Sequence, residues 1–215
     1  EAAEARIIFG ISMNTGEDMR RMAGDPFPYP WDPRNAREIL RWTISQGFDH
    51  LLYGVELGNE QNSRYTPAHQ VHNFGVLHEL LVELWPDVAK RPYVFGPDAH
   101  SLHGVTAPWD RSILAWLGDS VSGMRSAGTP YHGVTHHEYV EVQPTLAGFR
   151  NASTLRLTEQ IATAVVSTVR AADSDVLIFA GEIGPHNGGN PPCNHSSMRW
   201  APFGDSFWYA DSLAA

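Results

Sequence analysis

The stretch at residues 54–62, GVELGNEQN, decides how the rest of the chain is interpreted. An apolar run at residues 50–57 is typical of a buried strand, and it closes on Glu56, Asn59 and Glu60. A carboxylate at the end of a buried strand is costly to ionise without partners. A carboxyl group that resists ionisation can hold a proton near neutral pH, which a general acid must do. We therefore predict that Glu60 is a proton donor.

The composition is that of a globular protein. The chain has 215 residues, of which 42% are hydrophobic and 18% charged, so it can bury a sizeable core. Its formal net charge of −9 disfavours binding to a polyanion, and we expect no nucleic-acid partner. The single cysteine, Cys193, excludes an intrachain disulfide. No apolar run has the length of a transmembrane segment.

Strand-like and helix-like segments alternate along the whole chain. Strands are predicted at residues 6–13, 50–57, 92–96, 131–140 and 176–180, with helical spacing of apolar residues after each of them. This order predicts a parallel α/β sheet with helices outside, either doubly wound or a (β/α)8 barrel. Glycine-rich nucleotide-binding motifs are absent, which weakens the doubly wound nucleotide-binding alternative. We expect one domain and no cofactor.

Local patterns place several polar side chains. Asp32, Thr66 and Asp110 are predicted to cap the first three helices. Alternation along residues 131–140 puts His137 and Tyr139 on one face of the strand and His136 and Glu138 on the other. Residues of catalytic type follow the strands, at the edge where both parallel architectures carry their sites: Glu60, Asp98, Tyr139 and Glu182.

Glu60 and Glu182 end the second and fifth predicted strands. In a closed barrel these strand ends face each other across the mouth, and two opposed carboxyl groups are the minimum equipment for glycoside hydrolysis. A separation of about 5–5.5 Å between them predicts retention of anomeric configuration. A donor such as Tyr139 would keep Glu182 ionised. The alternative is that both are exposed loop carboxylates without a shared role.

Five ordered motifs resemble the heparanase family, glycoside hydrolase family 79. They are VELGNEQN, the GPD after the third strand, VTHHEY, GE followed by a Gly-Gly pair, and a tail ending FWYADSL. The resemblance also takes in Phe9-Gly10 and WDPRNAR, and so runs over nearly the whole chain. It implies a retaining (β/α)8 glycosidase that cleaves β-linked glucuronic acid from oligo- or polysaccharides. It also implies an extracellular, cell-surface or lysosomal location.

The resemblance assigns a role to each matching residue. Glu60 becomes the acid/base and Glu182 the nucleophile, with Asn59 contacting the 2-hydroxyl of the sugar. Tyr139 would hydrogen-bond the nucleophile, and His137 would line the sugar subsite. The backbone amides of Gly188 and Gly189 would hold the uronate carboxylate, since glycine lets an anion approach closely. No metal is implied.

The chain also departs from the family pattern. Counting Glu60 as the end of strand four makes the visible strands three to seven, so residues 1–215 are expected to be a partial catalytic domain. Strands one, two and eight and the family's β-sandwich would then lie outside it. Asn187 stands where the family has a tyrosine. With Lys90 as its one lysine, the chain is suited to a glucuronide with little sulfation.

Two further hypotheses remain open from the sequence. One is a non-catalytic or truncated glycan-binding relative that keeps the motifs without a working barrel. The other is a histidine-rich metal protein, suggested by 11 histidines, among them His69, His72 and His78 on one predicted helix. Their spacing is not that of metal ligands, which argues for three solvated or packed side chains instead.

Overall fold

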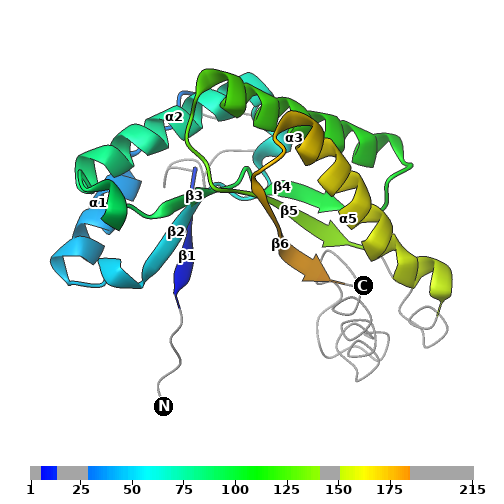
Figure 1. Ribbon diagram of the computed structural model, residues 1–215, viewed down its shortest axis with the longest axis horizontal. Coiled ribbons are helices and arrows are strands. Elements are labelled where there is room, and N and C mark those ends of the chain that lie inside the picture. Colours follow the sequence, from blue (N-terminus) through cyan, green and yellow to red (C-terminus); the bar gives the residue numbers. More distant parts are fainter. Residues whose placement is uncertain (1–5, 14–28, 141–150, 185–215) are drawn as a thin grey trace, which may run out of the picture.

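The computed structural model describes residues 6–13, 29–140 and 151–184, which form one parallel sheet covered by helices (Figure 1). The strands in this part of the chain are β1 (Ile7–Ile11), β2 (Leu52–Leu57), β3 (Tyr93–Phe95), β4 (Ala99–Leu102), β5 (Gly133–Tyr139) and β6 (Leu177–Gly184). The long helices are α1 (Arg34–Ser45), α2 (Pro67–Leu84), α3 (Pro108–Ala127) and α5 (Ala152–Ala172). Short 3-10 turns, η2 (Asp49–Leu51), η3 (Gln61–Ser63) and η4 (Val88–Lys90), lie between them.

The strands lie side by side in the order of the sequence. β1 pairs with β2 and β2 with β3, while β5 pairs with β6, and every pairing is parallel. β3 meets β5 at Phe95 and Gly133, and β4 meets the next part of β5 at Ala99 and His136. β3 and β4 are therefore two halves of one strand position, interrupted at residues 96–98.

Figure 1 shows α1, α2, α3 and α5 arching over the same side of the sheet. In a doubly wound fold the strand order reverses and helices cover both faces. Sequential order with helices on one side is instead the arrangement of a (β/α)8 barrel, whose other sheet face lines the interior. The fold is therefore the incomplete (β/α)8 barrel that the family resemblance implies, and not the doubly wound sheet that the strand pattern alone also allowed; the described residues form five strand positions.

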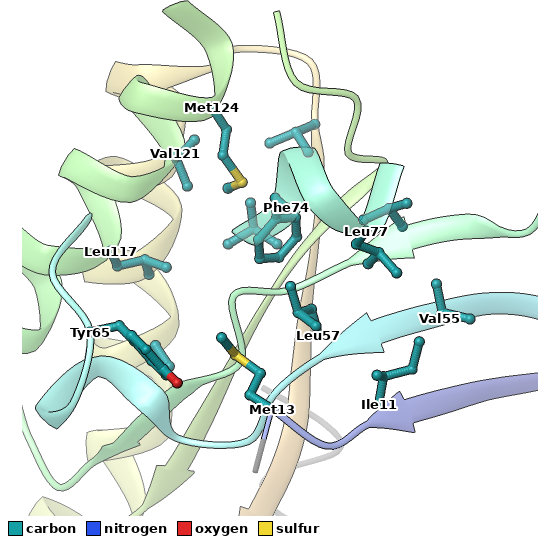
Figure 2. Close-up of a cluster of buried hydrophobic side chains, with 14 of the residues drawn as sticks. Ile11, Met13, Val55, Leu57, Tyr65, Phe74, Leu77, Leu117, Val121 and Met124 are labelled. Carbon is teal, nitrogen blue, oxygen red and sulfur yellow. The ribbon is translucent and has the colours of Figure 1, made fainter. Parts of the chain in front are cut away.

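The main core fills the space between the sheet and the helices (Figure 2). Val55 and Leu57 of β2 point outward from the barrel into this layer and are fully buried. Residues at helical spacing on α2 and α3 meet them, namely Phe74, Leu77, Leu117, Val121 and Met124. The layer orients the sheet, and it leaves the opposite face of each strand for the barrel interior.

Aromatic rings fill the interior face below the strand ends. The rings of Phe95 and Phe179 lie 5.5 Å apart in an edge-to-face arrangement. Gly133 sits beneath both rings, where an added Cβ would lie 2.7 Å from Phe95 and 2.8 Å from Phe179. The glycine is therefore required by the close approach of two rings, and the aromatic layer forms an apolar floor under the polar strand ends.

Two of the three predicted helix caps differ in the structure. Thr66 caps α2, accepting a hydrogen bond from the His69 backbone N–H. α1 has Pro33 at its cap position, and Asp32 accepts from the Arg34 N–H one residue later. Asp110 lies in the first turn of α3 and accepts from the His103 N–H outside the helix. An Asp near the start of a helix can accept a hydrogen bond from any N–H that the surrounding loop places nearby. The local sequence does not specify which N–H this is.

β4 was not predicted. Its sequence, AHSL, is short, and it follows a Gly-Pro-Asp break that is typical of a loop. Its pairing with β5 comes from the continuation of the strand position begun by β3. Among the described residues, no helix is both long and apolar enough to cross a bilayer.

Two neighbouring residues on α2 should contribute differently to stability. Leu81 is fully buried and Val82 is 40% exposed. We expect Leu81→Ala to lower the free energy of unfolding by about 2–5 kcal/mol, because it leaves a cavity under the sheet. Val82→Ala should change it by less than about 0.5 kcal/mol. Urea unfolding followed by circular dichroism measures both, and equal effects would contradict the assigned core.

Candidate active site

The end of β2 turns sharply so that Glu60 points back over the sheet. Gly58 has φ +87°, and a Cβ there would lie 2.8 Å from Met13 Sδ and 2.9 Å from Gln61 Cγ, so only glycine fits. Glu60 follows with φ +52°, in the left-handed region that a side chain disfavours. Its backbone N–H donates to the carbonyl of Asp98 at 2.9 Å. This bond ties the end of β2 to the break between β3 and β4.

Asp98 lies in that break and is almost completely buried. It also has φ +52°, and its backbone N–H donates to Thr135 Oγ1 of β5 at 3.0 Å. Two non-glycine residues in the left-handed region therefore sit next to each other across the sheet, Glu60 and Asp98. Such conformations cost about 1–3 kcal/mol each and persist where surrounding bonds determine them, typically at functional sites.

A register shift in β6 decides the direction of Glu182. Ala180 pairs with His136, whereas Glu182 pairs with His137, so Gly181 is an extra residue in the ladder. In a regular strand Glu182 would share the outer face with Ala180. The bulge turns Glu182 to the interior face instead, which is a common use of bulges beside active sites. A Cβ on Gly181 would lie 3.3 Å from Asp98 Oδ1, so glycine also suits the close packing here.

These three irregularities bring the predicted residues together around His137. Its Nδ1 lies 2.8 Å from Glu60 Oε1 and 3.4 Å from Glu182 Oε2. Its Nε2 lies 2.8 Å from Asp98 Oδ1. One ligand-type atom from each of Glu60, His137 and Glu182 lies within 4.8 Å of the others. The carboxyl groups of Glu60 and Glu182, which are far apart in the sequence, therefore lie close together.

Further polar groups complete the surroundings of the two carboxylates. The Tyr139 hydroxyl donates to Glu182 Oε2 at 2.7 Å. His100 Nε2 lies 3.6 Å from Glu60 Oε2. Asn59 lines a cavity of about 260 Å³ together with Glu56 and Asp98 on the β1 side of the site. The structure thus places Asn59, Glu60, His137, Tyr139 and Glu182 at one edge of the sheet.

Exposure separates groups that a ligand can reach from groups that it cannot. The side chain of Glu60 is 23% exposed and that of Glu182 is 46% exposed. The side chains of His137 and Asp98 are 2% and 3% exposed. A ligand can therefore contact the two glutamates, while the imidazole and the aspartate lie beneath them.

The carboxylates determine the charge on His137. Burial alone would lower the pKa of the imidazole, but the hydrogen bonds and charges of Asp98, Glu60 and Glu182 outweigh it and raise the pKa to about 9. The pKa of Glu56, on β2 beneath the site, is also raised, which for a carboxyl group favours the neutral form. Burial and the neighbouring Asp98 carboxylate raise the pKa of Glu56, although a hydrogen bond with Thr135 partly offsets this. One cation and four carboxyl groups therefore lie together at the strand ends.

The trio Glu60, His137 and Glu182 could also offer one ligand atom each to a metal ion. An imidazolium cannot coordinate a metal ion, so His137 would first have to lose the proton that the neighbouring carboxylates stabilise on its ring. In the described part of the chain, these three residues are the group whose ligand atoms lie close enough to share a metal ion. The histidines of α2 do not belong to it. Those histidines pack locally, with His69 stacked on Tyr29 at 3.8 Å and His72 5.5 Å from the same ring.

Sequence reasoning found most of this arrangement but gave no role to two of its members. Asp98 was recognised only as a residue that follows a strand, and His100 was not singled out. Both belong to the GPDAH segment at the break between β3 and β4, where polar residues after a strand are the available signal. Gly188 and Gly189, predicted at the substrate carboxylate, lie outside the described residues, as does Asn187, which stands where the family has a tyrosine.

The raised pKa of His137 predicts a pH-dependent stability. Because the folded-state pKa lies above the unfolded value of 6.5, the stabilisation is complete below about pH 6.5 and is lost as the pH rises through about 9. We expect the unfolding free energy of the wild type, relative to His137→Gln, to fall by roughly 3 kcal/mol over that interval. Urea unfolding at closely spaced pH values measures it. Parallel pH curves for the two proteins would show that His137 carries no such charge.

The chain is similar to a known protein family and to a solved structure. A solved structure similar to this one is the crystal structure of a monomeric beta-xylosidase from Caulobacter crescentus CB15, at 14% identity and a TM-score of 0.48. That match covers 74% of this chain and 31% of the xylosidase chain. A search of curated protein sequences finds no match. Residues 1–214 match the family described as "Glycosyl hydrolase family 79, N-terminal domain". The chain therefore belongs to glycosyl hydrolase family 79.

Proposed function

We propose that this protein is a retaining glycoside hydrolase in which Glu60 is the acid/base and Glu182 the nucleophile. The observation that carries the proposal is the approach of the two carboxyl groups, with one oxygen of each within 4.8 Å of the other. Retaining enzymes have their carboxyl groups about 5–5.5 Å apart, whereas inverting enzymes leave about 6.5–9.5 Å for a water molecule. The short separation favours direct attack by one carboxylate.

The reaction divides into two steps with these roles. In the first, the Glu182 carboxylate attacks the anomeric carbon, the glycosidic bond breaks, and the Glu60 proton moves to the leaving oxygen. In the second, the Glu60 carboxylate takes a proton from water, whose oxygen attacks the same carbon and releases Glu182. The Tyr139 hydroxyl, 2.7 Å from Glu182 Oε2, holds the nucleophile in place and stabilises its charge.

The proposed substrate is a β-linked glucuronic acid residue of an oligo- or polysaccharide. Membership of family 79 and the resemblance of the chain to heparanases support this class. The carboxyl groups around His137 repel a uronate, so the substrate carboxylate needs donors of its own, and we assign them to the backbone amides of Gly188 and Gly189. The net charge of −9 favours a glycan with little sulfation. A glycan substrate of this class fits an extracellular, cell-surface or lysosomal location.

Substitution of each glutamate tests the two roles. We expect Glu182→Gln to lower kcat on 4-nitrophenyl β-glucuronide by more than about 10³-fold, because no glycosyl-enzyme can form. Glu60→Gln should lower kcat by about 10²–10⁴-fold on substrates with alkyl leaving groups. Its effect on 4-nitrophenyl β-glucuronide should be smaller, since 4-nitrophenolate leaves with little protonation.

The test has two controls, a glutamate variant away from the site and a set of alternative substrates. Glu79→Gln, on the exposed surface of α2, should keep wild-type kinetics. The corresponding β-glucoside and β-xyloside test the uronate preference. Equal hydrolysis by wild type and Glu182→Gln would exclude the assigned nucleophile, and equal rates on all three sugars would exclude the glucuronide preference while leaving the hydrolase intact.

A second test concerns the phenol beside the nucleophile. Tyr139→Phe removes the hydrogen bond to Glu182, and we expect kcat to fall about 10–100-fold, as for the loss of a bond to a charged group. Tyr131→Phe is the matched control, because the Tyr131 hydroxyl bonds to Asp173 in the same way but away from the site. It should lower stability and leave kcat unchanged. The Tyr139 role is wrong if both variants lose activity only in proportion to stability.

A further inference from the structure

We propose that Asp98 is a positioning residue that keeps His137 as an imidazolium, whose Nδ1–H serves Glu60 and Glu182 in turn. The inference rests on the proposed function and extends it to a buried residue beneath the two glutamates. It starts from the position of one nitrogen. His137 Nδ1 lies 2.8 Å from Glu60 Oε1 and 3.4 Å from Glu182 Oε2, so a single N–H is within reach of both carboxylates.

The chemistry of retention moves one negative charge between these two carboxylates. Before the first step Glu182 is ionised and Glu60 carries the proton. After it, Glu182 is an ester and Glu60 is the carboxylate. A donor fixed between them can follow the charge by a small shift of its hydrogen bond. His137 is so placed, and its 2% exposure means that water does not compete for the bond.

The imidazole can do this only with a proton on Nδ1 at every stage. A neutral imidazole has one N–H, and the Nε2 side of His137 faces Asp98 Oδ1 at 2.8 Å. The buried Asp98 carboxylate is the ion-pair partner of the Nε2 side and compensates the positive charge of the ring. Without the charge of Asp98, the ring would be a neutral imidazole with its proton on Nε2. Its Nδ1 would then carry a lone pair, which cannot donate to Glu60 or Glu182.

Asp98 is itself held firmly. Its N–H donates to Thr135 Oγ1 at 3.0 Å, and its carbonyl accepts from the Glu60 N–H at 2.9 Å. Gly181 packs so closely that a Cβ there would lie 3.3 Å from Asp98 Oδ1 and 3.7 Å from the His137 ring. The aspartate thus links the acid/base turn, the imidazole and the nucleophile strand, which explains why it occupies a left-handed conformation that costs free energy.

Within the described residues, four carboxyl groups interact with the imidazole. Glu60 faces it from the turn after β2, Glu182 from β6 and Asp98 from the break between β3 and β4. Glu56 of β2 interacts with its charge from below, and its own raised pKa reflects burial and the Asp98 carboxylate. Tyr139 reaches it only through Glu182. Of these groups, Asp98 is the buried one whose carboxylate lies at Nε2.

The test is Asp98→Asn, which keeps the size and the backbone bonds of the residue and removes its charge. We expect kcat to fall about 10–100-fold on both alkyl and 4-nitrophenyl β-glucuronides, because the donor serves both steps, while KM changes less than about threefold. In NMR spectra of the imidazole nitrogens, His137 of the wild type should titrate at about pH 9. In Asp98→Asn it should titrate well below that value and carry its proton on Nε2.

Glu138→Gln is the matched control. Glu138 lies on the same strand as His137 but on the opposite face, is equally buried, and has a carboxylate oxygen 3.7 Å from His136 Nε2. It should lose stability as Asp98→Asn does, yet keep kcat and the His137 titration. The proposal is overturned if His137 still titrates near pH 9 in Asp98→Asn, or if the two variants lose activity equally at matched stability.

The two readouts separate this inference from the function on which it rests. A wild-type protein inactive on every aryl β-glycoside would refute the hydrolase. The NMR titration of His137 needs no substrate, and it would still decide whether Asp98 holds the imidazolium. An active wild type with an unchanged titration in Asp98→Asn would instead refute the role of Asp98 alone.

Discussion

The arrangement of the site depends on a single buried cation. Glu60, Asp98 and Glu182 would repel one another at these distances if they were placed together without compensation. His137 lies among all three, and its charge offsets the repulsion while its two nitrogens fix the direction of the contacts. The carboxylates in turn keep the imidazole charged despite its burial. Each partner thus makes the position of the others possible.

The barrel brings the residues of this network together. Parallel strands in sequential order bring their carboxyl ends to one edge, and the helices on the outer face leave the inner face for functional side chains. The regular parts of β2, β3 and β5 pack into an apolar layer, with an aromatic floor formed by Phe95 and Phe179. The polar groups stand above this floor, where the strands stop following regular geometry.

Much of the site follows from local sequence patterns. Alternation on β5 correctly places His137 on the interior face, opposite His136 and Glu138, and the apolar runs correctly locate five strand positions. The motifs after the strands identify Glu60, Tyr139 and Glu182 as neighbours. β4 and the exact caps of α1 and α3 were missed, because they depend on which strand or loop lies alongside and not on the residues themselves.

The sequence by itself determined the alternation of strands and helices, the family, and the kinds of side chain at the strand ends. The alternation and the side-chain types depend on periodicity and residue type, which are local properties, whereas the family is indicated by the resemblance of five ordered motifs. Only the tertiary structure turned Glu182 inward through the bulge at Gly181 and set Asp98 beneath His137. Those outcomes depend on contacts between distant segments, because a bulge or a left-handed residue is stable only where neighbouring strands hold it.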